Sequence, residues 1–136
     1  PQLSHKQWPY YNELIKIIKS KHTDFEIVIA PGPNEMEEAN KYNATLIINN
    51  KKALNIMELA GLIKKSSFVI ANDTGPAHMA AHLGVKGVVL FGYHTTPQKV
   101  SIETDLFKAI TKNKLGDLSP DTVYSEIKDK IKMIND

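Results

Sequence analysis

Residues 68–84 read FVIANDTGPAHMAAHLG, which places an apolar run, a polar turn and a second apolar segment next to one another. The run at 68–71 is typical of a parallel strand that is covered on both faces. The turn at 72–74 supplies side-chain oxygens, and Pro76 suits the first turn of a helix. Small and apolar residues at 77–84 fit that helix, which a glycine then ends. The stretch therefore predicts a strand, a turn and a helix in immediate succession.

The junction between this strand and this helix is a candidate anion site. Free backbone N–H groups and the helix dipole point outward where the carboxyl end of a strand meets the amino end of a helix. The Thr74 hydroxyl and the N–H groups of Gly75 and Ala77 could converge on a diphosphate, whereas Pro76 offers no N–H. Asp73 would repel phosphate, so it is better suited to orienting a lysine or bonding a hydroxyl. A simple helix cap explains Asp73 and Thr74 equally well.

Composition is that of a globular protein with a single domain. The 136 residues are 42% hydrophobic and 24% charged, which is ordinary for a chain with one buried core. The net charge is +2 and the lysines are dispersed, so no basic stripe favours nucleic-acid binding. The absence of cysteine excludes disulfides and thiolate metal sites. No apolar run approaches the ~20 residues of a transmembrane helix.

Helical and strand patterns alternate along the chain, separated by short polar connections. Such alternation predicts an α/β fold, namely a Rossmann-like, doubly wound parallel sheet with helices on both faces. Asn55 with Glu58 matches a capping box, Ser119 before Pro120 matches an N-cap, and Trp8 is expected on the apolar face of the first helix. The expected helices are 8–21, 34–42, 55–65, 77–84 and 119–134, and the expected strands are 25–30, 45–48, 68–71, 87–91 and 106–110.

The beginning of the chain differs from that of a complete doubly wound domain. The chain opens at Pro1 without an initiator methionine, and no strand precedes the first helix. Domains of this kind usually begin with a strand. We therefore expect residues 1–136 to form one domain that is truncated at its amino end and belongs to a longer protein.

Two other interpretations of residues 68–84 have less support. His78 and His82 share one helix face, but Met79 stands where a zinc protease needs glutamate, and no third ligand is evident. His78, in the first helical turn, is a better partner for an anion. The sequence at 73–75 also occurs in aspartic proteases, which need paired aspartates in an all-β scaffold. The following helix and the alternating pattern exclude that interpretation, and no metal or cofactor is expected.

Two further loops follow strands and are therefore expected at the same edge of the sheet. Glu35 could accept hydrogen bonds from a ribose, although an acidic residue also favours the start of a helix. Residues 92–97 read GYHTTP and include Thr95, so they offer donors that suit phosphate or sugar. Turn chemistry alone also explains this loop.

Together these residues resemble the carboxyl-terminal domain of the lipopolysaccharide heptosyltransferase family, glycosyltransferase family nine. Residues 6–9 (KQWP) resemble its Lys/Arg-x-Trp-Pro opening, and residues 72–78 (NDTGPAH) resemble its Asn/Ser-Asp-Thr-Gly-Pro-x-His block. Residues 88–97 resemble the strand and Gly-Pro-Thr-x-Pro loop that follow, with Tyr93-His94 at the usual proline. Residues 118–123 resemble the start of the last helix, so the resemblance spans nearly the whole chain.

The resemblance implies the donor-binding half of a two-domain GT-B enzyme that transfers heptose from ADP-heptose with inversion. Two residues would support catalysis, because Lys6 would contact the donor phosphates and Asp73 would position Lys6 or contact the sugar. The other implied donor-binding residues are Glu35 at the ribose, Leu54 at the adenine, Thr74, Gly75 and Pro76 in the diphosphate turn, His78 near the phosphates, and Thr95 in the later loop.

The resemblance also implies partners beyond these residues. The amino-terminal domain, absent here, would bind a lipopolysaccharide core acceptor and supply the carboxylate base, so we expect this chain alone to be inactive. The expected location is cytoplasmic, with the full-length protein at the cytoplasmic face of the inner membrane. The alternatives are another GT-B transferase or sugar-nucleotide epimerase, a non-catalytic nucleotide-binding module, and a purely structural α/β domain.

Overall fold

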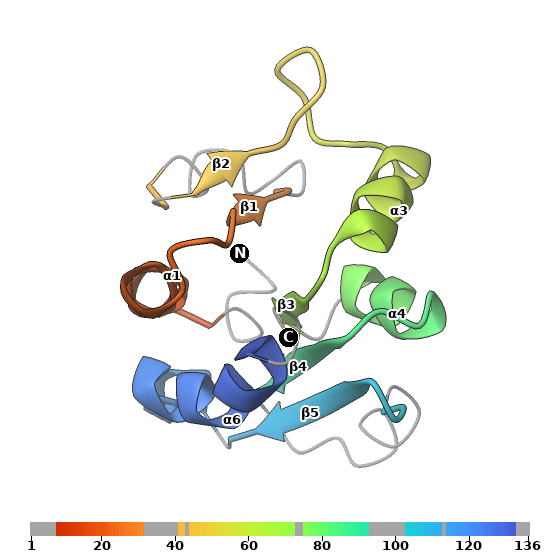
Figure 1. The fold of residues 1–136 in the computed structure, drawn as a ribbon. Helices are drawn as coiled ribbons and strands as arrows, with labels where there is room; N and C mark the ends of the chain where they lie inside the picture. Colours follow the sequence, from red (N-terminus) through yellow and green to blue (C-terminus); the bar gives the residue numbers. More distant parts are fainter. Residues whose placement is uncertain are drawn as a thin grey trace.

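The computed structural model of the chain describes residues 8–31, 41–42, 44–72, 75–92, 103–112 and 114–132. Within these ranges helices and strands alternate along the chain (Figure 1). In chain order the elements are α1 (Tyr11–Lys21), β1 (Val28–Ile29), β2 (Thr45–Leu46), α3 (Ile56–Lys65), β3 (Val69–Asn72), α4 (Gly75–His82), β4 (Gly87–Phe91), β5 (Phe107–Thr111), the 3₁₀ helix η2 (Leu115–Asp117) and α6 (Pro120–Lys132).

All strand pairs among the described residues are parallel. β4 is the centre of a three-stranded sheet with β3 on one side and β5 on the other, and β1 and β2 form a second sheet. All five residues of β4 are buried, as expected for a central parallel strand. The predicted α/β class with parallel strands is therefore confirmed.

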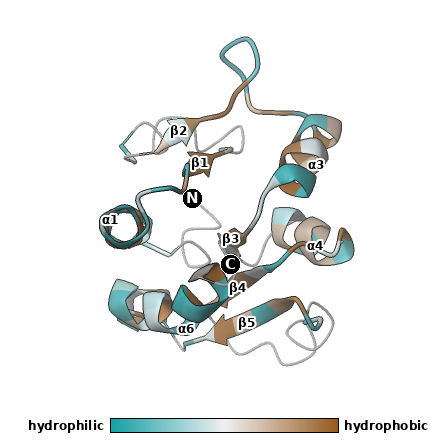
Figure 2. Ribbon diagram, viewed as in Figure 1, coloured by the Kyte–Doolittle hydropathy of each residue, from teal (hydrophilic) through white to brown (hydrophobic). Residues whose placement is uncertain are grey.

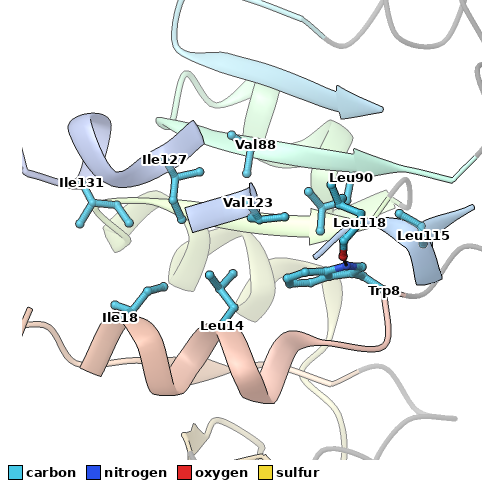
Figure 3. Close-up of a cluster of buried hydrophobic side chains, with 10 residues drawn as sticks. All are labelled: Trp8, Leu14, Ile18, Val88, Leu90, Leu115, Leu118, Val123, Ile127 and Ile131. Atoms are coloured by element: carbon cyan, nitrogen blue, oxygen red, sulfur yellow. Dashed lines mark hydrogen bonds between the residues drawn. The ribbon is translucent and has the colours of Figure 1, made fainter. Parts of the chain in front are cut away.

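Helices cover both faces of the larger sheet (Figure 1). Val88 and Leu90 of β4 pack in a cluster with α1 and α6 (Figure 3), whereas Val89 and Phe91 pack in a second cluster with α3 and α4. Successive side chains of a strand point to opposite faces, so β4 serves both clusters. Figure 2 shows hydrophobic colouring on β3 and β4, while the visible surfaces of α1 and α6 are largely hydrophilic. The doubly wound arrangement is confirmed.

Gly84 ends α4, as the sequence predicted. Gly84 has φ +72°, a left-handed conformation that glycine adopts without steric cost. Its N–H donates to the Ala81 carbonyl at 3.2 Å, and the Val85 N–H donates to the Ala80 carbonyl at 3.1 Å. This pair of bonds is a Schellman motif, which satisfies the last carbonyls of a helix. The chain then enters β4, so β3, α4 and β4 form one continuous crossover.

The first helix begins later than predicted, because α1 starts at Tyr11 and Trp8 precedes it. A residue before proline is disfavoured in helical conformation, and Trp8 precedes Pro9. Trp8 is nevertheless buried, with only 1% of its surface exposed, and packs in the cluster between α1 and α6. The predicted position on the helix face was wrong, while the predicted burial in the core was correct.

Several other predicted boundaries differ from the observed ones. The strand expected at 25–30 is limited to Val28–Ile29, although backbone bonds from Thr45 to Ile27 and from Ile47 to Ile29 extend its contact with β2. β3 and β5 are each shifted by one residue from their predicted starts. Lys41 and Tyr42 lie outside any helix, so the helix predicted for 34–42 is wrong at its end. Residues 34–40 of that prediction lie outside the described residues. Among the described helices, none is both long and apolar enough to cross a membrane.

Candidate functional site

The described residues on either side of positions 73–74 form the predicted strand and the predicted helix. β3 ends at Asn72 and α4 begins at Gly75, with Pro76 in its first turn. Ala77 is fully buried against α3 and β4, which holds the amino end of α4 to the sheet. Asp73 and Thr74 form the connection and lie outside the described residues. The amino terminus of α4 thus comes two residues after the carboxyl end of the parallel strand β3. A helix amino terminus in this position favours anions.

The two histidines of α4 differ in exposure. His78 is half-buried in the first turn, whereas His82 lies at the last residue of the helix and retains more contact with solvent at that end. Among the described residues, no cluster of three or more histidine, cysteine, aspartate or glutamate side chains could hold a metal ion. Because it belongs to the first turn, His78 lies at the end of α4 where the helix dipole favours anions.

Asn72 connects this junction to the beginning of the described chain. Its side-chain oxygen Oδ1 accepts a hydrogen bond from the Trp8 backbone N–H at 3.1 Å and another from the Tyr11 hydroxyl at 3.0 Å. The two donors are 64 and 61 residues away in the sequence. The segment that begins at Trp8 and the residue before Asp73 are therefore held side by side. The sequence pattern marked Asn72 only as one of several polar turn residues.

Trp8 itself is fixed by a second set of contacts. Its indole Nε1–H donates to the Leu118 carbonyl at 2.7 Å (Figure 3). The rings of Tyr10 and Tyr11 meet the indole edge-on, with centroids 6.0 Å and 5.1 Å from it. Edge-on aromatic pairs of this kind add to the stability that burial supplies. The Trp-Pro motif is thus a structural anchor beside the candidate site, a role that the pattern of apolar spacing did not predict.

Leu54 lies in a short, well-bonded connection between β2 and α3. Leu54 is half-buried. Before it, Asn49 and Lys52 exchange two backbone hydrogen bonds of 2.9 Å around a tight turn whose central residues, Asn50 and Lys51, have φ of 51° and 66°. Two central residues with positive φ are characteristic of a hairpin turn. The sequence did not indicate this turn, because no glycine marks it.

The predicted capping box after Leu54 is confirmed. The Asn55 side chain accepts from the Glu58 N–H at 2.8 Å, and the Glu58 carboxylate accepts from the Asn55 N–H at 2.9 Å. The same carboxylate also accepts from the Asn49 side chain at 2.5 Å. Glu58 therefore joins the hairpin turn to the start of α3 and fixes the two ends of the segment that contains Leu54.

Substitution Asn55→Ala is expected to lower the free energy of unfolding by about 1 kcal/mol, because the first turn of α3 loses its side-chain acceptor. Asn55→Ser retains a capping oxygen and is expected to cost only a fraction of this amount. Thermal unfolding of the two variants beside the unmodified chain measures the difference. Equal stability of the two variants would show that the cap does not stabilise α3.

The structure does not describe the remaining residues of the predicted site. Lys6, Glu35 and Thr95, like Asp73 and Thr74, lie outside the described residues. A cavity of about 310 Å³ is present elsewhere, between β5, η2 and α6. None of the residues that line this cavity belongs to the predicted site. The site is therefore defined here by its described members, which are Leu54, Asn72, Gly75, Pro76 and His78.

Comparison with solved structures defines the class of fold. The structure of E. coli heptosyltransferase WaaC with ADP-2-deoxy-2-fluoro heptose matches with a TM-score of 0.77 and 21% identity, covering 93% of this chain and 40% of that one. E. coli ADP-heptose lps heptosyltransferase II matches with a TM-score of 0.77 and 18% identity, covering 97% of this chain and 44% of that one. The fold is thus an α/β domain of the kind found in GT-B heptosyltransferases, and the chain spans about two fifths of the length of these structures.

The sequence agrees with this fold assignment. Residues 2–122 match the family model of glycosyltransferase family 9 (heptosyltransferase), and the chain belongs to this family. A comparison with curated proteins finds no significant match. Family membership confirms the resemblance that the KQWP and NDTGPAH motifs indicated, and it identifies the chain as glycosyltransferase-related.

Proposed function

We propose that this chain is the donor-binding domain of an inverting glycosyltransferase that transfers heptose from ADP-heptose to a lipopolysaccharide core acceptor. The observation that carries the proposal is the β3–α4 junction, where Asn72 ends a parallel strand and Gly75 begins a helix. Family membership over residues 2–122 supports the reaction class. The similarity to E. coli heptosyltransferase WaaC with ADP supports an adenine nucleotide as the ligand of this kind of fold.

The diphosphate is proposed to bind at the amino end of α4. The backbone N–H groups of Gly75 and Ala77 belong to the first turn of this helix, and its dipole favours negative charge there. The Thr74 hydroxyl would add a hydrogen bond. Lys6 precedes Trp8 by only two residues, and Trp8 is bonded to Asn72 at the end of β3. A lysine at this position would neutralise charge on the departing ADP, and stabilising charge that develops in the transition state is a large part of catalysis.

The other parts of the donor would bind residues that follow strands of both sheets. Glu35 follows the strand β1 and would accept bonds from the ribose, and Leu54 lies before α3, where it would face the adenine. Asp73 would contact the sugar or orient Lys6, and His78 would lie near the phosphates from the first turn of α4. Thr95, which follows β4 in the sequence, would complete the sugar side.

The acceptor and the base are assigned to a second domain. Inverting transfer needs a carboxylate base that takes the proton of the acceptor hydroxyl while this oxygen attacks the anomeric carbon. The bond from the anomeric carbon to the diphosphate oxygen breaks on the opposite side, and ADP leaves with the electron pair. In-line placement of the two groups requires both domains. A place at the cytoplasmic face of the inner membrane is part of the same proposal, because the acceptor is a lipid-linked core.

Titration of the folded chain with ADP tests this proposal, with binding followed by calorimetry or by amide chemical shifts. ADP is expected to bind, whereas no heptose transfer is expected. Lys6→Ala and Thr74→Ala should each weaken binding by about 1–3 kcal/mol, because a charged or buried phosphate contact is lost. Thr74→Ser retains the hydroxyl and should bind nearly as well as the unmodified chain. Lys19→Ala removes an exposed lysine from the other end of α1 and serves as the charge control.

Three outcomes would contradict the proposal. Absence of ADP binding at millimolar ligand in a folded sample would remove the donor-binding role. Tighter binding of UDP or CMP than of ADP would favour a different sugar-nucleotide enzyme of the same fold. Loss of stability without loss of binding in the Lys6 and Thr74 variants would favour a purely structural role for these residues.

A further inference from the structure

We propose that Asn72 is a positioning residue for the donor site, because it holds Trp8, two residues after Lys6, at the end of β3, directly before Asp73 and Thr74 in the sequence. This inference rests on the proposed donor site, and it adds a residue whose effect on binding acts through another side chain. Its basis is the pair of hydrogen bonds that converge on Asn72 Oδ1 from Trp8 and Tyr11.

The orientation of Asn72 follows from the periodicity of β3. Ile70 packs with the cluster of α1 and α6, whereas Val69 and Ala71 pack with the cluster of α3 and α4. Since side chains alternate along a strand, Asn72 points to the same face as Ile70, toward the start of α1. An apolar residue would continue this face, but a carboxamide stands there instead. The oxygen of a carboxamide has two lone pairs, and the Trp8 N–H and Tyr11 hydroxyl supply a donor for each.

Of the two hydrogen bonds, the one from the Trp8 backbone N–H is nearer to Lys6 in the sequence. Only two peptide units separate the Cα atoms of Trp8 and Lys6, a span of at most about 7–8 Å. On the other side, Asn72 is the residue directly before Asp73. The side-chain oxygen of Asn72 therefore connects two segments of the chain. One contains Trp8, two residues after Lys6, and the other ends at the residue before Asp73 and Thr74. A variant without this oxygen would still contain Lys6, Asp73 and Thr74. The Trp8 backbone would no longer be hydrogen-bonded to the end of β3.

The Tyr11 hydroxyl gives the sharper test, because the chain contains a matched control. Tyr10 and Tyr11 both meet the Trp8 indole edge-on, with interplanar angles of 84°. The Tyr11 hydroxyl bonds to Asn72, whereas the Tyr10 hydroxyl bonds to the Gly116 carbonyl at 3.0 Å in an exposed position. Tyr11→Phe and Tyr10→Phe thus remove the same atom from adjacent residues and retain both ring contacts.

The experiment measures ADP affinity and thermal stability for Tyr11→Phe, Asn72→Ala and Tyr10→Phe. Asn72→Ala is expected to weaken ADP binding about tenfold and Tyr11→Phe about threefold, which is the size of effect that loss of one or two hydrogen bonds produces. Tyr10→Phe should leave the affinity unchanged. Exchange of the Trp8 backbone amide with solvent should be faster in Asn72→Ala, and this readout requires no ligand.

Combination with Lys6→Ala separates positioning from a structural role. If Asn72 acts through Lys6, neither Tyr11→Phe nor Asn72→Ala should weaken binding further once the Lys6 side chain is removed. A loss that persists undiminished in the Lys6→Ala background would overturn the inference. So would equal affinities for Tyr11→Phe and Tyr10→Phe, with the donor site itself left standing. Absence of ADP binding to the unmodified chain would instead overturn the proposed function, and this inference with it.

Discussion

Trp8→Ala is expected to lower the free energy of unfolding by about 3–5 kcal/mol, the range for loss of a buried tryptophan side chain. The indole is 1% exposed and lies among Leu14, Val123 and other residues of the cluster between α1 and α6 (Figure 3). Alanine would leave a cavity there and would remove the hydrogen bond to the Leu118 carbonyl. Because globular domains are stable by only about 5–15 kcal/mol, this change removes a large part of the total.

The thermal midpoint should fall by roughly 10–20 °C, and far-UV circular dichroism measures it without the tryptophan signal. Trp8→Phe is the matched control, because it fills most of the space and retains an aromatic ring but loses the indole N–H. It should cost about 1–3 kcal/mol, since the Leu118 carbonyl loses its partner. A cost below about 1 kcal/mol for Trp8→Ala would mean that the indole does not anchor α1 and α6 as the packing indicates.

Gly87→Ala is expected to destabilise the chain by about 1–3 kcal/mol or more, because an added Cβ has no room. Gly87 pairs with Val69 of β3 and with Phe107 of β5. A Cβ at this position would overlap the Val69 carbonyl oxygen and approach within 2.7 Å of the Phe107 ring. The obstacle is backbone held by hydrogen bonds on both sides of β4, so it cannot yield as a flexible side chain would.

Gly61→Ala provides a control of opposite sign. Gly61 lies inside α3, and an added Cβ would have nothing within 4 Å. Alanine is favoured over glycine in a helix, so this variant should gain about 0.5–1 kcal/mol. Denaturant unfolding of both variants gives the two changes on one scale. Equal effects of the two substitutions would contradict the close packing of β3, β4 and β5.

Trp8 and Gly87 bear on the proposed site through the elements that they hold together. β4 pairs with β3, whose last residue is Asn72, and Trp8 is bonded to the same Asn72. The core beneath the site therefore determines where the carboxyl end of β3 and the segment after Lys6 meet. Tyr11→Phe removes one hydrogen bond to Asn72 and leaves the packing of the core intact. Mild variants of this kind are therefore the better probes of binding.

The elements with strong local signals were predicted well. Their signals act within a few residues, such as Gly84 with its positive φ after α4 and the pair Asn55 and Glu58 at the start of α3. The elements of this kind are β3, β4, α4 and the capping box of α3. The burial of Trp8 was predicted correctly, but its anchoring contacts were not, because they join residues more than 100 positions apart, such as Trp8 and Leu118. The turn at Asn50 and Lys51 lacks glycine, so local propensity did not indicate it.

The sequence by itself determined the fold class, the strand and the helix within residues 68–84, and the family, because these depend on periodicity and on motifs that are contiguous in the chain. Only the tertiary structure decided that Trp8, Tyr11 and Asn72 meet at the end of β3. Hydrogen bonds between residues that are 61 and 64 positions apart exist only when the sheet and α1 are packed together. Their geometry follows from the folded core, and no local pattern in the sequence encodes it.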